Sequence, residues 1–116
     1  MESGLLTTHV LNGADGEPAP GVALSLHRLD PPLMVWSLLG LGTTDEDGRC
    51  SGLGAREALR PGTYKLRFET GSFWESRGRT SFFPYVEVVF SISDQQQRIH
   101  LPLLMTRFSY STYTGS

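Results

Sequence analysis

Two histidines, His9 and His100, lie at positions that suit acid–base chemistry. His9 lies within Leu6–Asn12 and His100 within Arg98–Leu104. If both segments are strands, residue alternation places each imidazole on the side opposite an apolar face. An imidazole titrates near neutral pH, so it can take a proton from water or give one to a leaving group. The alternative is a solvated surface side chain, which is our interpretation of the third histidine, His27.

Arg49 and Cys50 follow Asp47-Gly48, a dipeptide typical of a tight turn. A guanidinium group there would bind an anionic substrate or stabilise a developing oxyanion, since its planar fork matches paired oxygens. The alternative is a surface charge beside a turn. Cys50 is the only cysteine in the chain. With a histidine it would be a nucleophile, but a small buried side chain is the commoner role.

Short β-like segments separated by turns must position these residues. One helix is expected over Thr70–Gly78, with Thr70 or Ser72 as its N-cap and with Phe73 and Trp74 anchoring it. About seven or eight strands without a linker or a repeat predict an all-β, two-sheet antiparallel sandwich, a single domain over 1–116. The predicted strands are Leu5–Asn12, Val22–Leu29, Val35–Thr43, a brief segment near Ser51–Leu53, Thr63–Glu69, a buried Tyr85–Ser93, Arg98–Thr106 and Phe108–Thr114.

Composition excludes several classes of protein. The chain has 116 residues, 39% of them hydrophobic, and a net charge of −2. These values argue for one folded domain and against disorder, nucleic-acid binding or attraction to anionic lipid. No apolar run approaches the roughly 20 residues of a membrane span. No phosphate-binding glycine loop appears and the histidines lack ligand spacing, so no cofactor and no metal are expected.

Six stretches in order along the chain carry a resemblance to a known family: Leu6–Asn12, Thr44–Cys50, Pro61–Leu66, Phe83–Phe90, His100–Leu104 and Ser109–Ser116. Together they resemble the transthyretin-like (prealbumin-like) family, and within it the 5-hydroxyisourate hydrolases. The resemblance implies an enzyme that opens the ring of 5-hydroxyisourate to 2-oxo-4-hydroxy-4-carboxy-5-ureidoimidazoline in urate degradation, without a cofactor.

The resemblance also implies which residues form the site. In such hydrolases two histidines and an arginine share one pocket, and they correspond here to His9, Arg49 and His100. The two histidines would act as base, acid and water-orienting groups, with the division between them open. Arg49 would hold the substrate, and Ser116 would bind water or substrate through its hydroxyl or its terminal carboxylate. The implied catalytic residues are His9, Arg49, His100 and Ser116, and the implied substrate-binding residues are His9, Arg49, Tyr113 and Thr114.

One departure from the family pattern leaves a second function open. The hydrolase tail usually reads Tyr-Arg-Gly-Ser, and here Thr114 replaces the arginine, so altered activity is expected. The alternative is a non-catalytic carrier of a small aromatic ligand, such as thyroid hormone. A transthyretin carrier, however, resembles this chain over the fold but has Lys, Glu and Thr at the positions of His9, Arg49 and His100. Its tail also continues further. A third alternative is a structural sandwich without a small-molecule site.

Assembly and location are also implied by the resemblance. A homotetramer, a dimer of dimers, is expected, with the pockets in a channel where two dimers meet. A peroxisomal location is expected from eukaryotic relatives, although Tyr113–Ser116 is not an address of the Ser-Lys-Leu type. The first residues show no secretory signal, and without a targeting extension the cytoplasm is expected.

Overall fold

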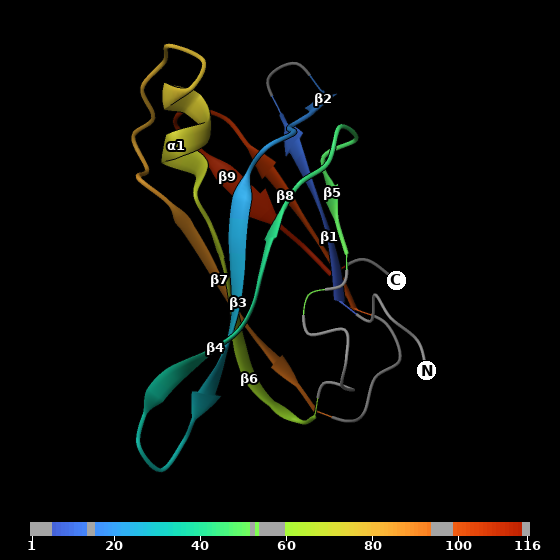
Figure 1. The fold of residues 1–116 in the computed structure, drawn as a ribbon, viewed down its shortest axis with the longest axis vertical. Helices are drawn as coiled ribbons and strands as arrows, with labels where there is room; N and C mark the ends of the chain where they lie inside the picture. The colour runs from blue at the N-terminus through green and yellow to red at the C-terminus, as the bar shows by residue number, and fades with distance from the viewer. Residues whose placement is uncertain (1–5, 14–15, 52, 54–59, 94–98, 115–116) are drawn as a thin grey trace.

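Two β-sheets face each other in the computed structural model, which describes residues 6–13, 16–51, 53, 60–93 and 99–114 (Figure 1). The first sheet contains β1 (Leu6–Asn12), β2 (Glu17–Pro18), β5 (Arg49–Cys50), β8 (Ile99–Met105) and β9 (Tyr110–Thr112). The second contains β3 (Ala23–Asp30), β4 (Val35–Thr43), β6 (Gly62–Phe68) and β7 (Val86–Ile92). The predicted two-sheet sandwich is confirmed.

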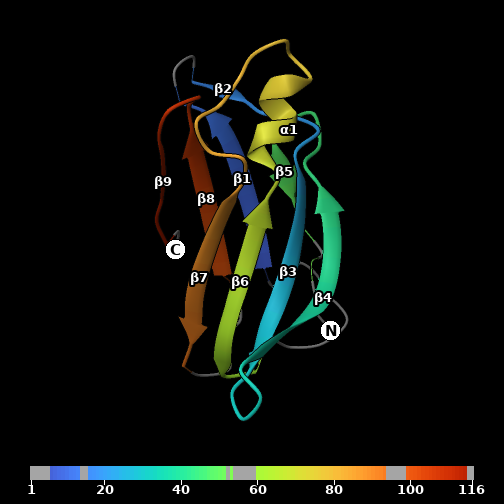
Figure 2. The same ribbon diagram turned by 90° about the vertical axis from the view of Figure 1, so that its left-hand side faces the viewer.

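The first sheet has β1 at its centre. The strand order is β2-β1-β8-β9, and β5 also pairs with β1. β1 and β8 run parallel, whereas β2, β5 and β9 join the sheet antiparallel. The second sheet has the order β4-β3-β6-β7 and is antiparallel throughout. Figure 2 shows these four strands side by side in front of β1 and β8.

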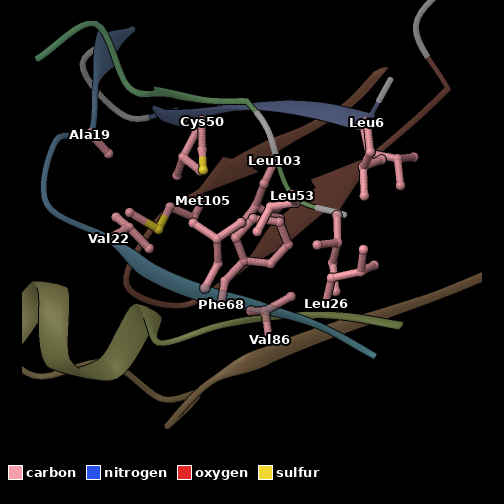
Figure 3. Close-up of a cluster of buried hydrophobic side chains, with 14 of the residues drawn as sticks. Leu6, Ala19, Val22, Leu26, Cys50, Leu53, Phe68, Val86, Leu103 and Met105 are labelled. Atoms are coloured by element: carbon pink, nitrogen blue, oxygen red, sulfur yellow. The ribbon is translucent and has the colours of Figure 1, made fainter. Parts of the chain in front are cut away.

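Alternation along the strands creates the core. On β1, Leu6 and Val10 are fully buried, while Thr7 and His9 between them are only half-buried on the outer face. Apolar side chains from both sheets interdigitate between the layers (Figure 3). Burial of such a side chain stabilises the fold by about 1.5–3 kcal/mol. The largest buried apolar residues include Leu6, Leu26, Tyr64, Leu66, Phe68, Leu103 and Met105.

Helix α1 (Thr70–Glu75) connects β6 to β7 and ends earlier than predicted. Its N-cap is Glu69, which makes no side-chain capping bond, so the predicted caps were wrong. Phe73 and Trp74 are buried as expected, and burial rather than capping therefore holds the helix. No helix in the described part of the chain is long and apolar enough to cross a membrane.

Three further details differ from the sequence-based predictions. The pairing expected near Ser51–Leu53 occurs instead at β5, directly after the turn. The two-residue strand β2 was not predicted. β7 is half-buried with exposed Glu87 and Val89, so the expectation of a buried strand was wrong. The sheet of β7 packs on the core with one face only, so alternate side chains of this strand meet solvent.

Candidate active site

The turn between β4 and β5 sets the position of Arg49. One carboxylate oxygen of Asp45 accepts hydrogen bonds from the backbone N–H groups of Asp47 and Arg49, each at 2.9 Å. Accordingly, these hydrogen bonds lower the pKa of Asp45, the larger share coming from Arg49. Gly48 adopts a φ of 77°, and its carbonyl accepts a hydrogen bond from the N–H of Val10 at 2.7 Å. The turn is therefore docked on β1.

This docking brings Arg49 beside His9. The two residues are direct partners in the antiparallel pairing of β5 with β1. Side chains at such paired positions lie on the same face of a sheet, with Cβ atoms about 4.5–5.5 Å apart. The Nε2–H of His9 donates to the carbonyl of Asp47 at 3.0 Å, since a carbonyl can only accept. In its neutral form His9 therefore carries its proton on Nε2.

His100 joins the same face from the opposite side of β1. Its direct partner across the parallel pairing of β1 and β8 is Thr7, whose Oγ1 lies 2.7 Å from His100 Nδ1. Burial lowers the pKa of His100, and the positive charges of His9 and Arg49 lower it further, while a hydrogen bond to the Thr7 backbone raises it in part. The structure therefore brings His9, Arg49 and His100 together on one outer face, where Arg49 is exposed and both histidines are half-buried.

The tail approaches this face along β9. Thr112 pairs with Leu103 of β8, and its hydroxyl donates to the carbonyl of Pro102 at 2.6 Å. Because β9 runs antiparallel to β8, the exposed Tyr113 and Thr114 follow in the direction of His100. The fourth expected catalytic residue, Ser116, lies outside the described residues.

Two partners of the histidines were missed in the sequence analysis. Thr7 shares a face with His9 by simple alternation, which was a readable signal, but its pairing with His100 depends on the parallel contact of β1 with β8. The carbonyl of Asp47 has no side-chain signature at all, because any residue at that position would present the same oxygen.

The other candidates lie elsewhere. Cys50 is buried in the core, and burial raises the pKa of its thiol, which suits packing rather than nucleophilic chemistry. His27 lies on the outer face of the other sheet and hydrogen bonds to Ser25. Among the described residues, no three His, Cys, Asp or Glu side chains gather as metal ligands.

Comparison with known proteins settles the family. A sequence profile of the HIUase/Transthyretin family matches residues 6–115. The chain belongs to this family. Within the family, the 5-hydroxyisourate hydrolase of Mus musculus is 51% identical over 115 residues, which cover 99% of this chain and 98% of the mouse protein.

Solved structures from both branches of the family, a hydrolase and a transthyretin, match the fold of this chain equally well. The Klebsiella pneumoniae 5-hydroxyisourate hydrolase matches with a TM-score of 0.84 and 34% identity over 100% of both chains. The transthyretin of Sparus aurata matches with a TM-score of 0.88 and 29% identity over 96% of both chains. The backbone therefore does not separate the two branches, and the side chains on the outer face of the first sheet must do so.

Proposed function

We propose that the chain hydrolyses 5-hydroxyisourate to 2-oxo-4-hydroxy-4-carboxy-5-ureidoimidazoline in urate degradation. The observation that carries the proposal is the placement of His9, Arg49 and His100 on three adjacent strands of one sheet face. The mouse relative, named a 5-hydroxyisourate hydrolase, supports it through 51% identity over nearly the whole of both chains.

The geometry divides the work among the three side chains. Arg49 binds the substrate and stabilises negative charge at the ring carbonyl, as a fixed guanidinium does for oxyanions. The lowered pKa of His100 keeps its ring neutral near pH 7, which suits a base that takes a proton from water. The water oxygen bonds to the carbonyl carbon as His100 takes the water proton, the carbon–nitrogen bond of the ring breaks, and the imidazolium of His100 gives that proton to the departing nitrogen. The free Nδ1 of His9 accepts a hydrogen bond from the water and orients it.

The carrier alternative draws its support from the fold, because transthyretin matches the backbone closely. A carrier for an apolar aromatic ligand needs a mostly apolar surface. Here a guanidinium and two imidazoles occupy the corresponding face, so we favour hydrolysis. Binding of an aromatic ligand without any acceleration of 5-hydroxyisourate decay would support the carrier instead.

We also propose that the protein works as a homotetramer, a dimer of dimers, with the site covered by a second copy. Arg49 is exposed in a single chain, and both histidines are only half-buried. Burial of the site would exclude bulk water and strengthen its electrostatic interactions. Near the open edge of β9, Phe108, Tyr110 and Tyr113 are 66%, 43% and 58% exposed, which suits a contact between copies. Light scattering during gel filtration measures the mass.

The direct test follows the absorbance decay of freshly made 5-hydroxyisourate with and without the protein. We expect acceleration over spontaneous decay, and a loss of about 10²- to 10⁴-fold for His9→Ala and for His100→Ala. The matched control is His27→Ala, which removes a histidine from the other sheet and should leave the rate unchanged. A wild-type rate equal to spontaneous decay, or full activity in both site variants, would refute the proposal. The peroxisomal location stays a prediction, to be tested by imaging the tagged chain in cells.

A further inference from the structure

Thr7 and His100 form the closest side-chain contact that the described part of the site contains. They are direct partners in the parallel pairing of β1 with β8, and Oγ1 lies 2.7 Å from Nδ1. Thr7 projects to the outer face together with His9, because Leu6, Thr8 and Val10 on the same strand are buried in the sandwich. The contact therefore belongs to the candidate active site and not to the core.

The direction of this hydrogen bond determines which nitrogen of His100 is available. A threonine hydroxyl can donate or accept, whereas a backbone carbonyl can only accept. The 2.7 Å contact between Thr7 Oγ1 and His100 Nδ1 therefore allows the ring to donate to the hydroxyl, and the backbone of Thr7 acts in the same sense because it raises the pKa of His100 in part. A neutral imidazole has one N–H. If that proton lies on Nδ1, the lone pair of Nε2 remains free.

His9 is held in the opposite manner. Its Nε2–H donates to the carbonyl of Asp47, so the other nitrogen, Nδ1, is the free one. The two histidines of the site are therefore fixed through different ring nitrogens by different elements: the turn before β5 holds His9, and β1 holds His100. This arrangement differs from that of His27, where the hydroxyl of Ser25 reaches Nε2 from the same strand at 2.8 Å.

We propose that Thr7 is a positioning residue that accepts the Nδ1–H of His100 and so leaves Nε2 to take the proton of the attacking water. The inference rests on the proposed hydrolysis for its kinetic consequence, but the placement of the proton is independent of any substrate. The charged groups that face His100 are His9 from β1 and Arg49 from β5. From the β9 side the phenol of Tyr113 follows.

The kinetic test compares Thr7→Val, which keeps the shape of the side chain, with Thr7→Ser, which keeps the hydroxyl. We expect Thr7→Val to lower kcat about tenfold, as the loss of one hydrogen bond to a reacting group does, with KM unchanged. The acid limb of its pH profile should move to lower pH, because the imidazolium of His100 loses an acceptor. Thr7→Ser should behave as the wild type. Thr63→Val is the matched control, since Thr63 pairs with Ser91 in the other sheet.

The second test reads the proton directly by ¹⁵N NMR of the imidazole rings at a pH where they are neutral. Resonances of His100 are identified by their loss in His100→Gln. We expect wild-type His100 to carry its proton on Nδ1, and Thr7→Val to shift the population toward Nε2. A wild-type ring protonated on Nε2 would overturn the inference even if Thr7→Val did not fold, and so would unchanged kcat in a folded Thr7→Val. Absent 5-hydroxyisourate turnover by the wild type would instead refute the proposed function and leave the NMR result to decide the role of Thr7.

Discussion

His9 and Arg49 lie directly opposite each other on β1 and β5, although three strands of chain separate them in the sequence. The turn that carries Arg49 is fastened to β1 by two hydrogen bonds. These run from the N–H of Val10 to the carbonyl of Gly48 and from the His9 ring to the carbonyl of Asp47. The cation and the imidazole are therefore positioned by one backbone arrangement, so a change in the turn acts on both.

Replacement of Arg49 tests its role as the cation of the site. We expect Arg49→Gln to lower kcat/KM about 10²- to 10³-fold, because the developing oxyanion loses its fixed partner. The kcat/KM of Arg49→Lys should lie between those of the wild type and Arg49→Gln, since lysine keeps the charge and loses the planar fork. Steady-state kinetics with 5-hydroxyisourate measures both. Arg79→Gln changes an exposed arginine far from this turn in the sequence and serves as the control. Equal kinetics for wild type and Arg49→Gln would remove Arg49 from the mechanism.

Gly48 is the residue on which the turn depends. Its φ is 77°, and an added Cβ would lie 2.5 Å from the carbonyl oxygen of Val10. We expect Gly48→Ala to lower the free energy of unfolding by about 2–4 kcal/mol, the sum of a left-handed backbone and a clash with another strand. Urea denaturation measures the change, and turnover should fall as Arg49 and His9 lose their register.

Gly21→Ala provides a matched control for that experiment. Gly21 has a φ of 78°, but an added Cβ would meet nothing within 4 Å. Its substitution therefore imposes the backbone strain alone, about 1–2 kcal/mol, without the clash. Equal destabilisation by the two substitutions would show that the contact of Gly48 with β1 has no energetic weight.

The sequence predicted the faces of the strands well and their partners poorly. Alternation correctly placed His9 and His100 opposite the core, because burial of Val10 and Leu103 leaves one orientation for each strand. The approach of the two histidines depends on the parallel pairing of β1 with β8, which joins the two ends of the chain. No local pattern specifies such a contact.

Two predictions, on the strand near Ser51–Leu53 and on the caps of α1, were wrong for reasons that lie in the neighbouring residues. The strand expected near Ser51–Leu53 begins earlier because the N–H of Asp45 already donates to the carbonyl of Arg49 at 2.8 Å. Pairing therefore starts at the first residue after the turn. The expected capping of α1 by Thr70 or Ser72 failed because the helix begins at Thr70, so both residues lie inside it and Glu69 takes the N-cap position.

The pH dependence of activity follows from the environment of His100. Burial, then the charges of His9 and Arg49, lower the pKa of its ring, so the neutral base persists below the ordinary value of about 6.5. We expect the acid limb of kcat/KM to lie below that pH. Arg49→Gln should move this limb upward, because it removes one of the charges that disfavour the imidazolium. An acid limb above the ordinary histidine value would contradict the assignment of His100 as the base.

The free energy of unfolding should also decrease at acid pH, as the activity does. Because the pKa of His100 is lower in the folded protein, the unfolded chain binds the proton first as the pH falls. The free energy of unfolding should therefore decrease as the pH falls below about 6.5 and level off below the folded pKa. His27, whose pKa is lowered mainly by burial and then by Lys65, acts in the same sense. The double variant with both histidines replaced by Gln should lose this dependence, as measured by urea denaturation at several pH values.

Substitution of Thr114 by arginine tests whether the tail contributes to substrate binding. It is exposed on the segment that follows β9 toward His100, where the hydrolase pattern has arginine. A restored cation there should attract an anionic substrate, and we expect Thr114→Arg to lower KM about fivefold at low ionic strength, as about 1 kcal/mol of Coulomb attraction in water does. The effect should shrink as salt is added, because exposed charges are screened. Thr114→Gln separates the length of the side chain from its charge and should leave KM unchanged. If Thr114→Arg and Thr114→Gln behave alike at every salt concentration, the tail does not approach the bound substrate, and Thr114 leaves the substrate-binding set.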